Sequence, residues 1–207
     1  MSDKPERKDI DKSQIDWNQH AEYWNEFDEA IDYTQHIVRL LSNRINIKNL
    51  DILELGCGTG LLIDHMTKDA RQIVAVDTAD KMIQVLDDKK YKNVITINDE
   101  LSEQTIKQYP ALQQKFDLIL AVSVCAFLPN YQEVLKIIKS SLNPNGIFIQ
   151  WDWLRNEREP DFGFTEDLLR ENYQQAGLTV ESIDIPFYME ENDEKMEVIM
   201  AIGTLKG

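Results

Sequence analysis

A run of glycines directly after an apolar strand is the feature that most constrains how this chain can fold. Residues 51–60 read DILELGCGTG, so a buried strand passes into a loop containing Gly56, Gly58 and Gly60, and a helix is expected to open at Leu61. Glycine adopts positive φ and has no Cβ, so such a loop turns sharply and lets a ligand approach its backbone. The free N–H groups at the following helix N-terminus favour an anionic group. The segment predicts a small-molecule site at a strand end.

The spacing of these glycines separates the known kinds of nucleotide loop. The pattern is G-x-G-x-G, whereas the dinucleotide fingerprint G-x-G-x-x-G requires glycine where this chain has Leu61. A P-loop would need Gly-Lys followed by Ser or Thr, and the loop lacks that sequence. The loop therefore disfavours NAD and FAD and excludes a P-loop. A Rossmann-type NAD-dependent oxidoreductase stays open as an alternative.

Strand-like runs alternate with segments of helical period along the rest of the chain. The further runs are 72–76, 93–97, 116–122 and 146–151. This alternation predicts an α/β fold with a mostly parallel sheet and helices on both faces.

The pattern changes after residue 164. Thr165 is expected to cap a helix that ends at Ala176, with Gly177 as its stop. Two strand-like runs follow, 178–189 and 195–205, and the polar link between them is too short for a crossover helix. These two strands must therefore be antiparallel neighbours.

Acidic side chains follow successive predicted strands. Asp77 ends the second strand 17 residues after Gly60, where a carboxylate can accept hydrogen bonds from ribose hydroxyls. The third strand ends at Asn98, Asp99 and Glu100, where a carboxylate can accept from an adenine amino group. The sequence thus predicts that polar groups from three strand ends meet at one crevice.

Length, charge and cysteine content limit the partners and the cellular compartment that fit this chain. The 207 residues suit one domain, and the formal net charge of −15 argues against nucleic acid or an anionic membrane as a partner. The longest apolar stretch, residues 118–128, is far shorter than the roughly 20 residues that a membrane span needs. The two cysteines suit a reducing compartment, so we expect a cytoplasmic protein. We expect a disordered tail over 1–15, a helical cover over 16–46 and a sheet core over 50–207, all of 16–207 forming a single domain.

Several segments in order resemble the small-molecule branch of the class I S-adenosylmethionine-dependent methyltransferases. ILELGCGTG is similar to the first motif, VAVDTADKMI to the second, TINDEL to the third, FDLILAVSVCAFLPN to the fourth-strand segment and LNPNGIFIQ to the fifth. The resemblance implies a Rossmann-like, seven-stranded sheet of order 3-2-1-4-5-7-6 with strand 7 antiparallel. It also implies S-adenosylmethionine as the methyl donor, S-adenosylhomocysteine as its product and a small-molecule acceptor.

The resemblance also implies a cofactor site. Glu54 and Gly56 would lie near the methionine amino group, Asp77 would bind the ribose and Asp99 the adenine amino group. Met82 and Leu101 would flank the adenine. The full expected set is Glu54, Gly56, Gly58, Gly60, Asp77, Thr78, Met82, Asp99, Glu100, Leu101 and Ala121.

The sequence indicates less about the part of the site that would bind the methyl acceptor. A sulfonium already activates its methyl group, so positioning can supply the rate and neither a catalytic triad nor a metal is required. We expect no metal site, and the candidates for a general base are Asp152, His36 and Tyr33. Many relatives carry a His pair where this chain has Ala126 and Phe127, so no base is expected there.

The aromatic residues expected in the substrate pocket are Trp24, Tyr33, Trp151 and Trp153. Aromatic faces beside acidic groups suit an amine or another cationic acceptor. The acceptor atom and the oligomeric state stay open at this point. A non-catalytic binding module of the same fold is a further alternative.

Overall fold

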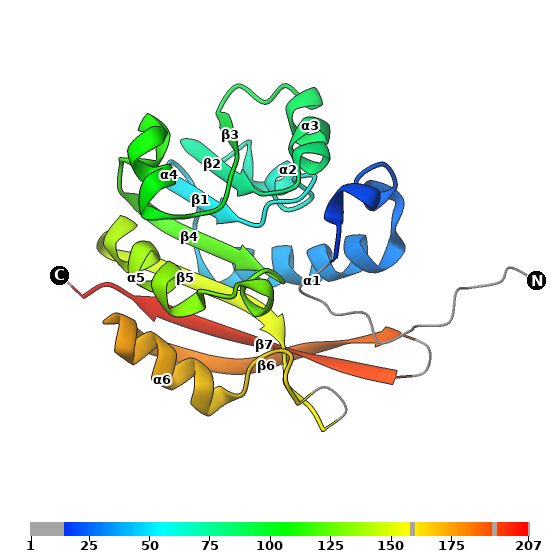
Figure 1. The fold of residues 1–207 in the computed structure, drawn as a ribbon, viewed down its shortest axis with the longest axis vertical. Coiled ribbons are helices and arrows are strands. Elements are labelled where there is room, and N and C mark those ends of the chain that lie inside the picture. Colours follow the sequence, from blue (N-terminus) through cyan, green and yellow to red (C-terminus); the bar gives the residue numbers. More distant parts are fainter. Residues whose placement is uncertain (1–14, 158–159, 192–193, 207) are drawn as a thin grey trace, which may run out of the picture.

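A mostly parallel sheet organises the molecule. The computed structural model describes residues 15–157, 160–191 and 194–206, and in these residues seven strands lie in the order β3-β2-β1-β4-β5-β7-β6 (Figure 1). The strands are β1 (Asp51–Leu55), β2 (Gln72–Asp77), β3 (Val94–Asn98), β4 (Phe116–Val122), β5 (Leu142–Trp153), β6 (Thr179–Glu191) and β7 (Glu194–Thr204). Strand β7 runs antiparallel to β5 and β6, and the other pairs are parallel. The predicted fold class, strand order and antiparallel edge are confirmed.

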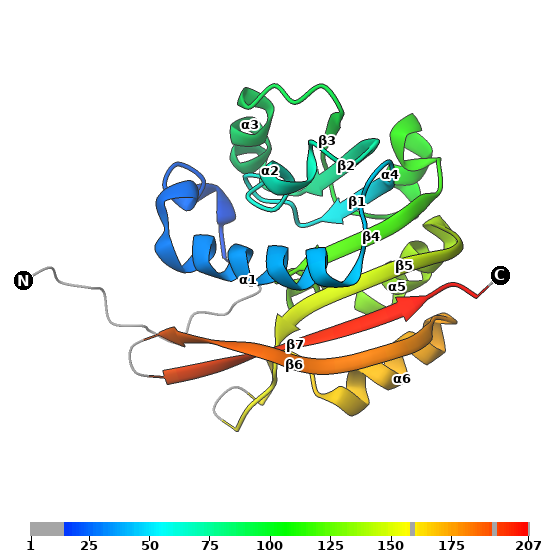
Figure 2. The same cartoon turned by 180° about the vertical axis from the view of Figure 1, so that it is seen from behind.

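Helices cover both faces of this sheet. α1, α2 and α3 lie on one face and α4, α5 and α6 on the other, as the two opposite views show (Figures 1 and 2). The helices are α1 (Asp28–Arg44), α2 (Ile63–Met66), α3 (Asp80–Asp88), α4 (Glu103–Gln108), α5 (Tyr131–Ser141) and α6 (Glu166–Ala176), and the 3₁₀ turns are η2 (Trp17–Gln19), η3 (Trp24–Glu26), η4 (Pro110–Leu112) and η5 (Cys125–Phe127).

Strand periodicity divides the apolar side chains between two cores. Successive strand residues point to opposite faces. Ile52 of β1 therefore packs with α1, α2 and α3, while Leu53 packs with α5 and α6. β1 is buried along its whole length, as expected for a parallel strand covered on both sides. The carboxyl ends of β1 to β5 consequently meet at one edge between two layers of helices.

The predicted helix boundaries of α6 are confirmed. The Thr165 hydroxyl accepts a hydrogen bond from the Leu168 N–H, and the helix ends at Gly177, whose φ is +83°. A glycine is favoured there because other residues are strained at positive φ.

The N-terminal cover is less helical than expected. Its first half forms only the 3₁₀ turns η2 and η3, and α1 is the one regular helix in it. Tertiary contacts hold these turns, since Asn18 accepts a hydrogen bond from the Lys81 N–H and Asn25 accepts one from the Thr59 hydroxyl. Such bonds to other elements outweigh the local helical period.

The helix after the glycine loop also begins later than predicted. Residues 61 and 62 form a turn, and α2 begins at Ile63.

The described residues include no helix of the length and apolar character that a membrane crossing requires.

Candidate functional site

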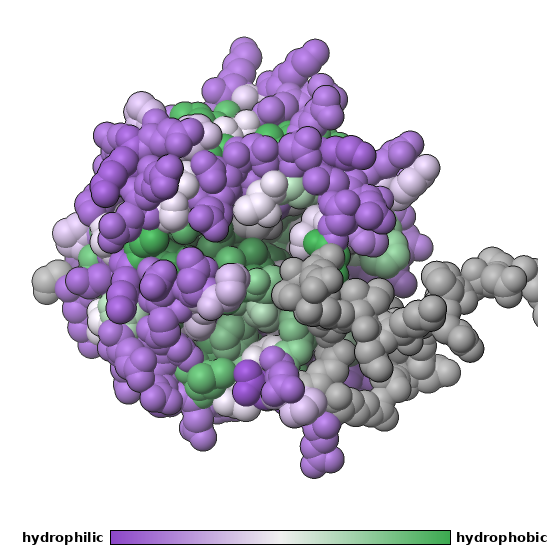
Figure 3. Space-filling model, viewed as in Figure 1, coloured by the Kyte–Doolittle hydropathy of each residue, from purple (hydrophilic) through white to green (hydrophobic). Residues whose placement is uncertain are grey.

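A cavity of about 670 Å³ lies at the carboxyl edge of the sheet. Residues that follow β1, β2, β3, β4 and β5 line it, and the N-terminal cover and the β6–β7 hairpin complete its walls. Figure 3 shows apolar side chains in a hollow on this face, surrounded by hydrophilic ones. The position agrees with the general location of ligands in open α/β sheets.

The glycine loop presents its backbone to the cavity at one position in particular. Gly56, Gly58 and Gly60 all have positive φ. A Cβ on Gly56 would approach Val124 to 2.6 Å, and one on Gly60 would approach Leu86 to 2.5 Å. Gly58 is different, because the nearest atom to its Cβ position is 3.9 Å away on Trp24. Gly58 therefore leaves space for a ligand, whereas Gly60 is required for packing against α3 and does not line the cavity.

Asp77 holds this loop in place from the end of β2. Its carboxylate accepts hydrogen bonds from the Gly58 N–H at 2.8 Å and from the Ala79 N–H at 2.9 Å. Burial raises the pKa of Asp77 above its usual value, although these backbone donors oppose the shift. Asp77 and Thr78 both line the cavity.

Glu54 places an unsatisfied carboxyl group in the same region. It lies on β1, lines the cavity and is only 3% exposed, and its Oε2 has no hydrogen-bond partner among the described residues. Burial, followed by the nearby charge of Asp77, raises the pKa of Glu54 to about 8. A buried carboxyl oxygen without a partner is costly, so this position favours a ligand that brings a hydrogen-bond donor or a positive charge.

The end of β3 and the start of α3 complete this half of the cavity. Asp99, Glu100 and the buried Leu101 line it, as does Met82 of α3, which is 2% exposed. Acidic groups thus stand beside two apolar surfaces. We call this region, over β1, β2 and β3, the donor half.

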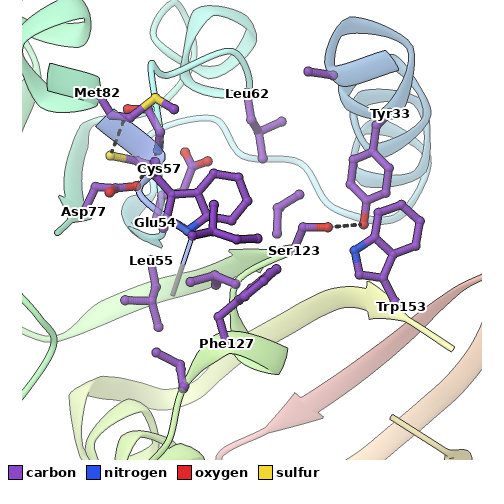
Figure 4. Close-up of a pocket in the computed structure, with 18 of the residues that line it drawn as sticks. Tyr33, Glu54, Leu55, Cys57, Leu62, Asp77, Met82, Ser123, Phe127 and Trp153 are labelled. Atoms are coloured by element: carbon purple, nitrogen blue, oxygen red, sulfur yellow. Dashed lines mark hydrogen bonds between the residues drawn. The ribbon is translucent and has the colours of Figure 1, made fainter. Parts of the chain in front are cut away.

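The other half, which we call the acceptor half, lies over β4, β5 and the β6–β7 hairpin. Figure 4 shows Tyr33, Ser123 and Trp153 on the opposite side of the cavity from Asp77 and Met82. The Tyr33 phenol oxygen accepts a hydrogen bond from the Ser123 hydroxyl at 3.2 Å, and the ring centres of Tyr33 and Trp153 are 5.5 Å apart. Burial raises the pKa of Tyr33, so its phenol stays protonated near neutral pH.

The N-terminal cover closes over both halves. Trp17 meets Phe127 of η5 edge to face at 5.4 Å, and Trp24 stacks on Phe27 at 6.0 Å. All four side chains line the cavity, as does Ile15, which we expected in the N-terminal tail. Residues 1–14 of that expected tail lie outside the described residues.

Five residues expected at the site do not line the cavity: Gly60, Ala121, Trp151, Asp152 and His36. Ala121 is fully buried, and the residues that follow it, Val122 to Val124, line the cavity in its place. Trp151 is fully buried in the core on the α1 side of the sheet, deeper along β5 than Trp153.

The polar members of this group have partners elsewhere. Asp152 is fully buried and accepts hydrogen bonds from the Trp153 N–H at 3.1 Å and the Ala126 N–H at 3.2 Å. Burial raises its pKa to about 7. His36 stacks on Phe187 with ring centres 4.6 Å apart and lies 3.8 Å from Asp32.

Other cavity residues were not expected from the sequence. Ser123 follows β4 with a φ of +51°, and Met189 and Met196 face each other across the β6–β7 hairpin. A local pattern does not single them out, because they reach the cavity only through the pairing of distant strands. The buried Cys57 also lines the cavity. In the ranges that the structure describes, His, Cys, Asp and Glu side chains form no group that could hold a metal.

Known proteins are similar to this chain both in sequence and in fold. The family described as a methyltransferase domain matches residues 23–177. A ubiquinone biosynthesis O-methyltransferase of Coxiella burnetii is 26% identical over 109 residues, which are 53% of this chain and 46% of that protein. The chain thus spans less than half the length of the curated relatives it matches.

Solved structures support the fold. One chain of the complex between the Haloferax volcanii Trm112 methyltransferase activator and a methyltransferase gives a TM-score of 0.74 at 14% identity, covering 94% of this chain and 99% of that one. N-methyltransferase NodS from Bradyrhizobium japonicum, in complex with S-adenosylhomocysteine, gives 0.67 at 15% identity, covering 93% and 100%. The chain therefore belongs to the methyltransferase domain family, and its resemblance to the class I S-adenosylmethionine-dependent methyltransferases is confirmed.

Proposed function

We propose that this protein transfers a methyl group from S-adenosylmethionine to a small-molecule acceptor. One observation carries the proposal, namely the unsatisfied Glu54 Oε2 in the donor half. The methionine part of the donor carries an ammonium group, which would supply both the hydrogen-bond donor and the positive charge that this oxygen lacks. NAD offers no primary ammonium group for that position, which argues against the oxidoreductase alternative.

The rest of the donor half fits the remaining parts of the same molecule. We infer that Asp77 accepts from the ribose hydroxyls and that Asp99 accepts from the adenine amino group. Met82 and Leu101 supply apolar surface for the adenine faces. The open backbone at Gly58 gives the ligand room to lie against the loop.

In this reaction the main task of the protein is to position the acceptor against the methyl donor. When bound, S-adenosylmethionine supplies a methyl group that its sulfonium already activates. The chain's own residues then align the acceptor and exclude water, and alignment of two reactants can contribute roughly 7 to 11 kcal/mol. Trp17 of the N-terminal cover contacts Phe127 of η5 in the cavity wall, consistent with that role.

None of the three candidate bases fits this cavity as a base. Asp152 and His36 do not line it, and Tyr33 lines it as a neutral phenol because burial raises its pKa. We therefore propose catalysis by positioning, with Tyr33 as a hydrogen-bonding group toward the acceptor. One of the matching curated relatives is named a ubiquinone biosynthesis O-methyltransferase, which supports a small-molecule acceptor. We treat residues 16–207 as one functional domain.

The proposal is tested first by ligand-dependent stability. S-adenosylhomocysteine should raise the melting temperature, because a ligand of the native state stabilises it in proportion to RT ln(1 + [L]/Kd), and NADH should not. A shift with NADH alone would refute the assignment. Release of S-adenosylhomocysteine in the presence of pooled metabolites then separates an enzyme from a non-catalytic binding module, which would bind without turnover.

A further inference from the structure

The cavity carries negative charge at both ends and no positive charge that the described residues supply. Asp77, Asp99 and Glu100 line the donor half beside Glu54, whose raised pKa keeps it mostly protonated at neutral pH while no ligand is bound. Glu29, Glu190 and Glu197 line the mouth of the acceptor half. Among the described residues, no lysine, arginine or histidine lines the cavity. The three glutamates of the mouth are solvent-exposed and come from α1, β6 and β7, so three separate elements bring acidic groups to one opening. We call these three residues the acidic mouth.

One cation lies next to the acidic mouth in strand register, but outside the cavity. Lys195 pairs with Glu190 across the β6–β7 hairpin. Its ammonium lies 4.0 Å over the Tyr188 ring, and neither Lys195 nor Tyr188 lines the cavity.

Inside the acidic mouth the walls are aromatic and apolar. Tyr33 and Trp153 present ring surfaces, and Met189 and Met196 form a paired, adaptable wall on the hairpin. Ring faces attract cations, and their hydrocarbon surface removes water from whatever they enclose. The acceptor half thus combines an acidic opening with a dehydrated interior.

On this basis we propose that the acceptor is an amine on an apolar body, and that it is methylated on nitrogen. The inference rests on the proposed methyltransferase function and names the substrate class of the same cavity. The acidic mouth attracts the protonated amine, and the apolar interior then favours its neutral form, because burial disfavours a charged group. The proton leaves through the mouth to solvent.

The reaction itself distinguishes an amine from an acidic acceptor. The amine lone pair forms the N–C bond as the methyl C–S bond breaks and its electron pair stays on sulfur. The positive charge therefore moves from sulfur to nitrogen, and nearby carboxylates stabilise the ammonium that forms. A carboxylate or phenolate acceptor would instead enter a cavity that repels it and offers it no cation.

A matched ligand series tests the inference. Phenethylamine, tryptamine and hexylamine, each with the carboxylic acid and the alcohol of the same skeleton, are added to the protein saturated with S-adenosylhomocysteine, and the additional shift in melting temperature is measured. The same compounds are then assayed for methyl transfer with S-adenosylmethionine. We expect amines alone to raise the melting temperature further and to be methylated. Binding of the acids in preference to the amines, or an absence of any amine effect, would overturn the proposal.

Charge variants sharpen the test. Glu29→Gln, Glu190→Gln and Glu197→Gln combined should raise the KM for an amine about tenfold, with an effect that shrinks in high salt, because exposed charges interact modestly and are screened. A control with Glu22→Gln, Asp88→Asn and Glu171→Gln removes the same charge from exposed positions outside the cavity and should leave KM unchanged. S-adenosylhomocysteine affinity should be the same in both variants. If the wild-type protein does not bind S-adenosylhomocysteine, the proposed function is refuted. If both variants change KM equally, only the inference that the acceptor is an amine is refuted.

Discussion

The two halves of the cavity are built in different ways. The donor half comes from consecutive strand ends, so Glu54, Gly58 and Asp77 lie within one short stretch of sequence, and the Gly58 N–H donates directly to the Asp77 carboxylate. The acceptor half combines segments from both ends of the chain, and side chains such as Tyr33 and Trp153 make its contacts. This difference indicates that donor binding is fixed by local geometry, whereas the acceptor site depends on long-range packing and can change without loss of the donor site.

The largest expected effect comes from removing the N-terminal cover. Deleting residues 1–27 removes η2 and η3 but keeps α1, whose Tyr33 and Ile37 belong to the core. We expect a folded protein in which methyl transfer falls more than about 100-fold, because water enters and the acceptor is no longer aligned. Single-turnover methyl transfer and circular dichroism measure the two results.

Deleting residues 1–14 is the matched control and should change neither binding nor transfer. Equal activity in the longer deletion would show that the aromatic turns only pack against the sheet. Trp24 would then be removed from the proposed site.

A smaller effect should follow from Asp77→Ala in the donor half. The variant loses the acceptor of two ribose hydroxyls and frees the N–H groups of Gly58 and Ala79. Hydrogen bonds to charged groups contribute about 1.5–3 kcal/mol each, so the Kd for S-adenosylhomocysteine should rise on the order of 100-fold. Calorimetry measures it, with Asp88→Ala as a control on an exposed surface. An unchanged Kd would contradict the ribose role.

The sequence predicts these two halves to different extents, and the reason is physical. Parallel strands bring their carboxyl ends to one edge, so Asp77, Asp99 and Glu100 could be assigned from strand positions alone. Ser123 and Met196 could not, because their place depends on how distant strands pair. Trp151 and Trp153 lie on the same face of β5, so the sequence does not distinguish them. They differ in how deeply they lie beneath α1: Trp151 is in the core, and Trp153 lines the cavity.

Proton release offers a more subtle test of the donor half. The pKa of Glu54 is about 8 without ligand, and an ammonium partner should lower it well below neutral. Binding of S-adenosylhomocysteine at pH 7 should therefore release most of one proton, and affinity should increase with pH up to the pKa. Calorimetry in buffers of different ionisation enthalpy measures this number. Glu54→Gln should bind about tenfold more weakly and release no proton.

The same carboxyl group makes a prediction about the unliganded protein. Its folded pKa is raised above the ordinary value of 4.5, so its contribution favours the folded state below that value and is lost as pH rises through about 8. The free energy of unfolding should fall over this range in wild type and fall less in Glu54→Gln. Denaturant titrations at pH 5 and pH 8.5 give the change in the free energy of unfolding with pH for each protein. An identical change in wild type and Glu54→Gln would show that Glu54 is ionised throughout this range.

The smallest expected effect separates the halves most cleanly. Tyr33→Phe removes only the phenol oxygen that accepts from Ser123, and the ring can keep its contacts with Trp153 and Phe187. The same phenol is our proposed hydrogen-bonding group toward the acceptor, and a neutral hydrogen bond contributes about 0.5–1.5 kcal/mol, so KM for the acceptor should rise roughly three- to tenfold. The Kd for S-adenosylhomocysteine should not change, because Tyr33 lies on the far side of the cavity from Asp77. Ser123→Ala leaves the same phenol without its partner and should raise KM by a similar factor, and the double variant should add little more, since both changes remove one bond. A change in donor affinity in either variant would show that the two halves are coupled, and the division of the site into a local donor half and a packed acceptor half would then have to be abandoned.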